Sequence, residues 1–313
     1  MMKRSKKIIL SAVAIIALVG VVAFSYTFFQ LSKISTVKIS KTNEDLGIKP
    51  EVIEKKETEV NEIINIALFG VDRRTKEEAS RSDSMIILSI DTDNKKIKMS
   101  SIMRDTYVQI KGHGETKINH AYAYGGPQLA IRTLNENFNL DIRDYVTVDF
   151  TNLEKIIDAI GGVTVEVDQD EISQIPGVSK AGSQNLNGKQ AVAYSRIRHT
   201  SGNDFRRTER QRTILSVMFT KIQSIGVTDF PGVVSELLPL TETSMNSIDI
   251  IKLGTKVLTS NTKTLEQARF PVDGYWSGKT IDRVWYLLAD MESTIEQLHN
   301  FIYDDIKPVA KSN

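Results

Sequence analysis

The sequence contains no cysteine, and its 313 residues include only four histidines, two tryptophans and seven prolines. Without cysteine the chain has no disulfide and no site for attachment of a lipoprotein anchor. The Gly-x-Ser-x-Gly nucleophile elbow, the Walker phosphate loop and the His-Glu-x-x-His zinc motif are also missing. The formal net charge is only +1, so a basic binding site in this chain has to be a local feature.

One long apolar run is present near the start of the chain. It covers residues 8–29 without a charge, and Lys3, Arg4, Lys6 and Lys7 precede it with no acidic residue. The run is long enough to cross a bilayer as a helix, and the basic flank predicts a cytoplasmic N-terminus. Because no A-x-A-like cleavage site follows, we expect an uncleaved anchor in the cell membrane with the rest outside. An exported chain without cysteine fits a Gram-positive bacterial surface.

Composition divides the chain into five segments. We expect a cytoplasmic basic segment, a transmembrane anchor, an extracytoplasmic stalk, a globular domain and a polar tail at residues 1–7, 8–29, 30–62, 63–305 and 306–313. The stalk is rich in Lys, Glu, Thr and Asn and has no apolar periodicity, which is typical of an extended or partly disordered segment.

Strand and helix patterns alternate along the globular domain. Strands are predicted at residues 63–71, 84–90, 96–103, 145–150 and 163–167. Helices are predicted at residues 127–138, 151–161, 204–225 and 281–303, the second one opened by a capping box at Thr151. Residues 91–94 carry turn residues that predict a hairpin, and 106–126 is predicted as a long loop. The pattern indicates an α/β domain with helices flanking a mixed central sheet.

An arginine block between Tyr194 and Arg212 is the most unusual part of the sequence. Its six arginines are Arg196, Arg198, Arg206, Arg207, Arg210 and Arg212. Guanidinium is always charged, and its planar fork matches two phosphate oxygens at once. Arg196 and Arg198 would share one face if this segment is extended. Shorter clusters at residues 81–83 and 104–106 have the same character. We infer a site for a multiply anionic ligand.

Part of this block begins a predicted helix. Asp204 is a candidate N-cap, and the apolar stripe of the helix extends backward onto Gln211, Arg210 and Arg207. Arginines in a first turn oppose the helix dipole, so helix and arginines attract the same partner, a phosphate. The alternative is a solvated helix surface, and Arg212 in particular could simply face solvent.

Two aspartates occupy strand ends. Asp72 follows the first predicted strand and Asp83 precedes the second, so both could reach one hard cation; Mg²⁺ takes one or two carboxylates plus phosphate oxygens. The alternative is that both only form turns. His113 and His120 lie in the predicted loop, where we expect hydrogen-bonding or solvent-facing roles, because zinc needs three or four ligands. Cationic clamps and carboxylates together suit phosphoryl transfer.

Several ordered motifs resemble the LytR-CpsA-Psr domain. The matching segments are residues 65–72 (NIALFGVD), 81–84 (RSDS), 101–108 (SIMRDTYV), 117–126 (KINHAYAYGG), 161–163 (GGV) and the arginine block from Ala193 to Arg212. The resemblance covers about residues 63–225. It implies an α/β/α sandwich that acts as a membrane-anchored, extracytoplasmic transferase. Such proteins move an anionic glycopolymer, wall teichoic acid or capsular polysaccharide, from a polyprenyl pyrophosphate carrier to the 6-hydroxyl of N-acetylmuramic acid in peptidoglycan.

The resemblance also implies roles for individual residues. Asp72 and Asp83 match the ligands of Mg²⁺ or Mn²⁺. The implied pyrophosphate-binding residues are Arg81, Arg104, Lys117, Asn119, Arg196, Arg198, Arg207 and Gln211. The implied catalytic residues are Arg104, Asp105, Arg196 and Arg198.

Two other functions use the same sequence features. A magnesium-dependent lipid pyrophosphatase or phosphodiesterase would need the same residues with water as the acceptor. A transcriptional regulator could bind nucleic acid through the arginines, but the predicted topology places them across the membrane from the chromosome, so we expect no nucleic-acid partner. A polyprenyl carrier also needs an apolar cavity, which the sequence does not locate.

Overall fold

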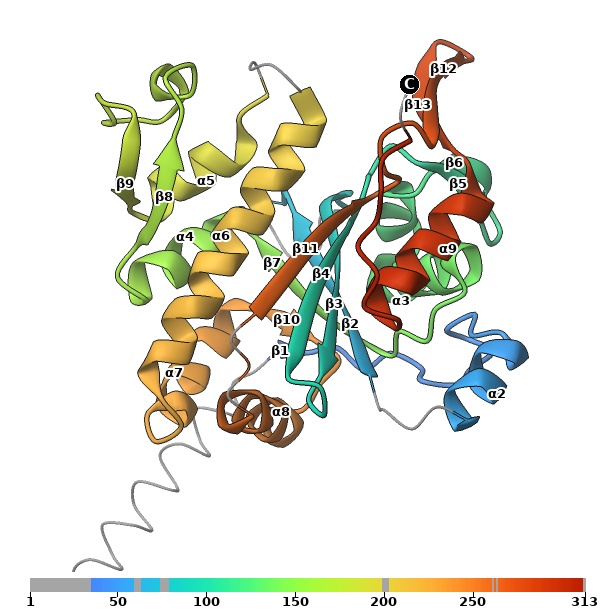
Figure 1. Ribbon diagram of the computed structural model, residues 1–313, viewed down its shortest axis with the longest axis horizontal. Helices are drawn as coiled ribbons and strands as arrows, with labels where there is room; N and C mark the ends of the chain where they lie inside the picture. Colours follow the sequence, from blue (N-terminus) through green and yellow to red (C-terminus); the bar gives the residue numbers. More distant parts are fainter. Residues whose placement is uncertain are drawn as a thin grey trace, which may run out of the picture.

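The computed structural model describes residues 35–58, 63–73, 79–198, 203–260, 262 and 264–311 (Figure 1). The predicted anchor at residues 8–29 lies outside these ranges. Within them, every helix is too short or too polar to cross a bilayer.

A mixed seven-stranded sheet forms the centre of the domain, in the order β1-β10-β7-β2-β3-β4-β11. Its strands are β1 Ser35–Thr36, β2 Ile63–Val71, β3 Ser82–Asp91, β4 Lys96–Ile102, β7 Asp144–Asp149, β10 Glu242–Thr243 and β11 Thr264–Phe270. Three separate two-stranded sheets are β5 Tyr107–Ile110 with β6 Gly114–Lys117, β8 Val163–Val167 with β9 Gly182–Leu186, and β12 Trp276–Ile281 with β13 Val284–Ala289. The predicted 91–94 turn does join β3 and β4 as an antiparallel pair.

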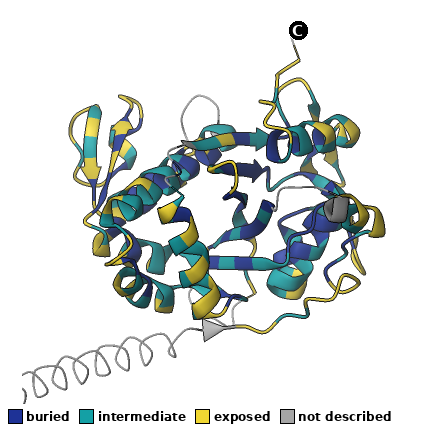
Figure 2. Ribbon diagram, turned by 60° about the horizontal axis from the view of Figure 1, so that its bottom comes forward, coloured by how far each residue is buried: buried dark blue, intermediate teal, exposed yellow. Residues whose placement is uncertain are grey.

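Helices cover both faces of the sheet. They are α2 Pro50–Thr58, α3 His120–Phe138, α4 Phe150–Ala159, α5 Gly188–Arg196, α6 Asn203–Ile225, α7 Phe230–Leu237, α8 Ser247–Thr259 and α9 Met291–Ile302. On one face α3 and α9 bury the larger core, and on the other α6 and α8 pack over the sheet (Figure 1). The strands of the sheet are mostly buried or half-buried, while the outer helix surfaces are exposed (Figure 2). This three-layer arrangement confirms the predicted fold class.

The directions of the strands place several strand ends at the same end of the sheet. β2 runs parallel to β7, β4 is antiparallel to β3 as β2 is, and β11 is parallel to β4. The carboxyl ends of β2, β4, β7 and β11 therefore meet beside the amino end of β3. In open α/β sheets, ligands bind in the crevice outside the carboxyl ends of the strands.

The predicted loop at residues 106–126 is wrong, because the segment is largely structured. It forms the β5–β6 hairpin and the first turns of α3. Gly125 and Gly126 interrupt α3 with non-helical backbone angles, and the helix resumes at Pro127. Gly126 has a positive φ of 62°, which glycine adopts without the steric penalty of a side chain.

Two other helix predictions need correction. α4 begins at Phe150 and its cap is Asp149, whose carboxylate accepts the backbone N–H of Asn152, so the capping box predicted at Thr151 is absent. The last helix covers only Met291–Ile302, capped by Asp290. The residues predicted as its first half instead form β13, where alternating large side chains pair with β12. β8 is a strand as predicted but pairs with β9 outside the main sheet.

Residues 35–58 pack against the domain, although we expect them to be part of an extended stalk. β1 pairs with β10 at one edge of the main sheet. Leu46 and Ile48 are buried in the larger core, and the side-chain amide of Asn135 donates to the Leu46 carbonyl at 2.9 Å. These few apolar residues anchor a polar segment without producing a detectable periodicity.

Candidate active site

The strand ends described above place the predicted aspartates side by side. Asp72 directly follows β2, and Asp83 lies near the start of the adjacent β3. Gly70 pairs with Ser84 and the next residue, Val71, pairs with Ser82, so Asp83 is left without a partner in a β-bulge. Bulges of this kind re-aim a side chain, and here the bulged residue is the carboxylate.

A polar cavity of about 400 Å³ opens at this end of the sheet, where β2 ends and β3 begins. It is lined by Asp72, Asp83, Phe150, Ser195, Arg196, Arg198, Arg207 and Gln211. Six of these residues come from the predicted site, and they belong to segments far apart in the sequence. Phe150 and Ser195 were not predicted; neither has a charge that would distinguish it from an ordinary structural residue.

Arg207 is the most deeply placed cation of the cavity. Only 2% of it is exposed, and its Nη2 donates to Asp204 at 2.9 Å and to the Asp83 carbonyl at 3.4 Å. Among the described residues, its Nε and Nη1 have no hydrogen-bond partner. Burial lowers the pKa of Arg207 to about 10, with Asp204 opposing the shift. Buried N–H groups without acceptors are costly, so this geometry favours an anion in the cavity.

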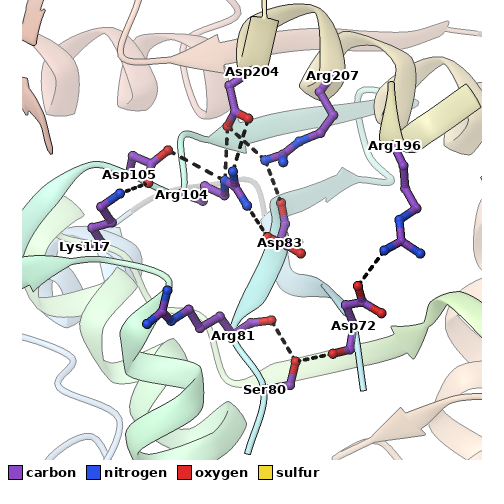
Figure 3. Close-up of polar contacts among 10 residues, drawn as sticks. All are labelled: Asp72, Ser80, Arg81, Asp83, Arg104, Asp105, Lys117, Arg196, Asp204 and Arg207. Atoms are coloured by element: carbon purple, nitrogen blue, oxygen red, sulfur yellow. Dashed lines mark hydrogen bonds and ion pairs between the residues drawn. The ribbon is translucent and has the colours of Figure 1, made fainter. Parts of the chain in front are cut away.

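Arg196 also lines the cavity and points to Asp72, whereas Arg207 points to Asp83 and Asp204 (Figure 3). The Nη2 of Arg196 donates to Asp72 at 2.7 Å, and its guanidinium lies 4.5 Å from the centre of the Phe150 ring. Half of the side chain is exposed, so a ligand could reach it. The predicted extended segment is wrong for this residue, because Arg196 is the last residue of α5 and Arg198 follows the helix.

A second charged cluster adjoins the cavity around Arg104 (Figure 3). Arg104 pairs with the Asp83 carboxylate and with Asp204 at 3.2 Å. Asp204 therefore bridges Arg104 and Arg207. It lies within the first turn of α6, so the predicted N-cap role is wrong. Its position three residues before Arg207 on a helix was the available signal for this contact.

The remaining predicted residues lie outside the cavity lining. Lys117 donates to Asp105 at 2.6 Å, and Asp105 is 3.7 Å from Arg104, so all three form one chain of charges. Asn119 is buried, and its backbone N–H donates to the Arg104 carbonyl at 3.3 Å. Arg81 is exposed and its side chain points away from Asp83 (Figure 3).

Three other arginines of the block have separate surroundings. Arg210 is buried against Glu171 at 2.5 Å and also donates to the Ile197 carbonyl, between the two cavity arginines Arg196 and Arg198. Arg206 points to Asp168 near the β8–β9 sheet. Arg212 is only 9% exposed, so the expectation that it faces solvent is wrong. Burial lowers its pKa to about 10.

An apolar cavity of about 170 Å³ adjoins the polar one. It lies between the sheet and the helices α4 and α6, and its apolar lining includes Leu68, Ile86, Val146, Ile214, Leu215 and Met218. Phe150, Ser195 and Gln211 line both cavities. A ligand with an anionic head and a hydrocarbon chain would match the two compartments.

The polar cavity offers two carboxylates to a cation. Both are engaged with arginines, Asp72 with Arg196 and Asp83 with Arg104. Within the described ranges there is no cluster of three or more His, Cys, Asp or Glu side chains arranged to hold a metal. Mg²⁺ takes one or two carboxylates when phosphate oxygens complete its shell, so the residues present fit this ion with a phosphate ligand.

The sequence is also similar to that of a known protein family. The sequence profile of the LytR_cpsA_psr family matches residues 26–301. The chain belongs to the LytR_cpsA_psr family. The match begins within the predicted anchor and runs into α9, so it covers all the strands and helices that form the two cavities.

Several members of the LytR_cpsA_psr family are similar to this chain. The regulatory protein MsrR of Staphylococcus aureus (strain COL) is 34% identical over 67% of this chain and 64% of its own length, so the match leaves about a third of MsrR uncovered. A polyisoprenyl-teichoic acid–peptidoglycan teichoic acid transferase, TagU of Oceanobacillus iheyensis, is 35% identical over 73% of this chain and 72% of its own. The structure of TagT (YwtF) with bound octaprenyl pyrophosphate superposes with a TM-score of 0.61 at 26% identity, covering 77% of this chain and 90% of TagT.

Proposed function

We propose that this protein transfers an anionic glycopolymer, wall teichoic acid or a capsular polysaccharide, from a polyprenyl pyrophosphate carrier to N-acetylmuramic acid of peptidoglycan. The observation that carries the proposal is the shared wall between a cationic cavity and an apolar one. A polyprenyl pyrophosphate has the same two parts, a doubly phosphorylated head and a hydrocarbon chain. The names of TagU and the octaprenyl pyrophosphate bound to TagT support the same donor.

The charge balance of the site suits a pyrophosphate. Five cationic side chains and four carboxylates lie in the two adjoining clusters, which leaves a net charge of +1. A pyrophosphate would take the free N–H groups of Arg207 and compete with Asp72 for the half-exposed Arg196. The arginines then neutralise the charge that develops on the leaving lipid phosphate when the acceptor oxygen attacks.

Asp72 and Asp83 would hold Mg²⁺, or Mn²⁺, once the phosphate oxygens replace the carboxylates on Arg196 and Arg104. When bound, the ion would supply additional neutralisation of the phosphate charge. Calorimetric titration with Mn²⁺ in the presence of a pyrophosphate analogue tests this assignment. Asp83→Asn should weaken metal binding, and unchanged binding in that variant would exclude Asp83 as a ligand.

Arg104 and Asp105 lie next to the cavity and are connected to its residues through ion pairs. Arg104 is linked to the lining through Asp83 and Asp204, and Lys117 neutralises Asp105. We assign Arg104 to the stabilisation of phosphate charge next to Asp83. Lys117 and Asn119 hold the Arg104–Asp105 turn, by an ion pair and a backbone hydrogen bond respectively.

We also propose that residues 8–29 anchor the protein in the cell membrane with the domain outside. A carrier whose hydrocarbon chain lies in the bilayer is then within reach of the apolar cavity. Protease added to intact protoplasts should digest the domain, and protection of the domain would contradict this topology.

A transfer assay with the detergent-solubilised full chain tests the activity. The lipid-linked teichoic acid precursor is incubated with and without purified peptidoglycan, and the products are separated by mass. We expect polymer linked to peptidoglycan through a phosphodiester and release of the carrier monophosphate. Polymer phosphate released at the same rate with and without peptidoglycan, and no linked product, would instead show a lipid pyrophosphatase.

A further inference from the structure

The β12–β13 hairpin projects from the body of the domain beyond β11 (Figure 1). It exposes large apolar side chains: 44% of Trp285 and 40% of Val284 are accessible to solvent. No residue of this hairpin lines either cavity described above. Val284 and Trp285 are consecutive residues of β13, so they lie on opposite faces of the hairpin, and the indole of Trp285 is the larger apolar surface and the better candidate for contact with a partner.

The hairpin is nevertheless attached directly to the charged cluster. The backbone N–H of Leu287 donates to the carbonyl of Asp105 at 2.9 Å, next to a β-bridge between Leu287 and Thr106. The Tyr286 ring packs edge-on against Tyr107 with centroids 4.9 Å apart. These contacts fix the position of β13 relative to the Arg104–Asp105 turn.

Further ring contacts tie the hairpin to the active site from both sides. The Lys117 ammonium lies 5.8 Å from the centre of the Tyr286 ring, and Trp276 packs against Phe205 at 4.9 Å. Phe205 is in the first turns of α6, two residues before Arg207. Both strands of the hairpin are therefore positioned by elements that also position active-site residues.

Trp285 lies against Gly278 of the neighbouring strand. A Cβ added at Gly278 would come within 2.8 Å of the indole Nε1 and 3.2 Å of two ring carbons. The glycine thus leaves the space in which the indole packs onto β12, a cross-strand pairing that stabilises a glycine in a sheet. The indole is held on the strand while much of its surface stays open to solvent. Such a fixed aromatic surface stacks well on the C–H face of a sugar ring.

We propose that the β12–β13 hairpin, centred on Trp285, binds the acceptor glycan strand of peptidoglycan. The proposal rests on the proposed function, which makes peptidoglycan the acceptor. Trp285 is two residues from Leu287, about 7 Å along the strand, so a sugar stacked on the indole is held near the Asp105 turn. The exposed Lys279 and Arg283 add positive charge suited to the carboxylates of peptidoglycan stem peptides.

The position of the hairpin favours a wall polymer over a membrane surface. The two edge strands of the main sheet are β1 and β11. β1 is the first described strand after the predicted anchor, and β11 leads into the hairpin. The surface that would approach lipid is thus at the other edge from Trp285. A lipid surface is the competing occupant.

Full-length Trp285→Ala tests the proposal, with Trp285→Phe as the conservative variant. Tyr124→Ala is the matched control, because Tyr124 is 49% exposed and lies on α3 outside both cavities. Three quantities are measured: retention on purified peptidoglycan sacculi, the KM for glycan strands in transfer, and hydrolysis of the lipid-linked donor without acceptor.

We expect Trp285→Ala to lose sacculus retention and to raise the acceptor KM about tenfold, while donor hydrolysis stays at the wild-type rate. Trp285→Phe should recover part of the binding, and Tyr124→Ala should match the wild type. An unchanged acceptor KM in Trp285→Ala would overturn the proposal. The proposal would also be overturned if Trp285→Ala lost binding to phosphatidylglycerol vesicles but kept wild-type retention on sacculi, because the hairpin would then bind lipid. Sacculus retention needs no turnover, so it tests the hairpin even if the transfer activity itself proves wrong.

Discussion

Replacement of Arg207 by lysine separates charge from geometry in the polar cavity. The ammonium keeps the positive charge but loses the planar fork, and Arg207 holds Asp204 while two further N–H groups remain for a ligand. Loss of one hydrogen bond between a charged donor and a phosphate oxygen costs about 1.5–3 kcal/mol. Affinity for the donor should therefore fall about 10- to 150-fold.

The adjacent Arg206 provides the control for this experiment. It occupies the next position on α6 but is 39% exposed and pairs with Asp168 away from the cavity. Exposed ion pairs contribute about 1 kcal/mol or less, so Arg206→Lys should bind the donor as the wild type does.

Calorimetric titration with a polyprenyl pyrophosphate analogue measures both affinities, and thermal unfolding without ligand checks that each variant folds. Equal affinities in the two variants would refute the argument from the buried fork. The same conclusion follows if only Arg206→Lys loses affinity.

Three more predictions concern the buried Glu171–Arg210 pair, the apolar cavity and the charge of Arg207. Glu171→Gln removes the buried carboxylate that pairs with Arg210 at 2.5 Å, so the free energy of unfolding measured in urea should fall by about 3–5 kcal/mol; a loss below about 1 kcal/mol would contradict this. Met218→Trp narrows the apolar cavity, so the KM should rise for long-chain donors and stay unchanged for donors with a short prenyl chain. Burial lowers the pKa of Arg207 to about 10, which still leaves the guanidinium charged near neutral pH, so analogue binding should be constant between about pH 6 and 8; a fall in affinity within that range would be inconsistent with this.

Local patterns in the sequence were enough to predict the central elements of the fold. The apolar run of β2, interrupted only by Asn65, identifies a largely buried strand, and the predicted range of residues 63–71 agrees with the structure. The arginine block gave the chemistry of the cavity, because Arg196, Arg198 and Arg207 do line it. These signals lie within single segments and need no knowledge of which segments meet.

Features that depend on contacts between distant segments were not predictable in the same way. Asp204 is a residue type that commonly caps helices. Its pairing with Arg104, which follows β4, depends on β4 lying near the start of α6. The hydrophobic residues of β13 also fit a helix until their pairing with β12 is known. Arg210 and Arg212 have the charge of ligand-binding residues, yet burial in the structure separates both from the cavity.

The packing of residues 35–58 on the domain shortens the connection between the domain and the proposed membrane span. If residues 8–29 span the membrane as we propose, only the five residues from 30 to 34 separate the span from β1. Even fully extended, they reach no more than about 18 Å. A thirty-residue tether would let the enzyme sample the depth of the wall, whereas this connection would confine it to a thin layer next to the lipid. New polymer would then be attached to the innermost peptidoglycan, and older strands further out would be beyond its reach.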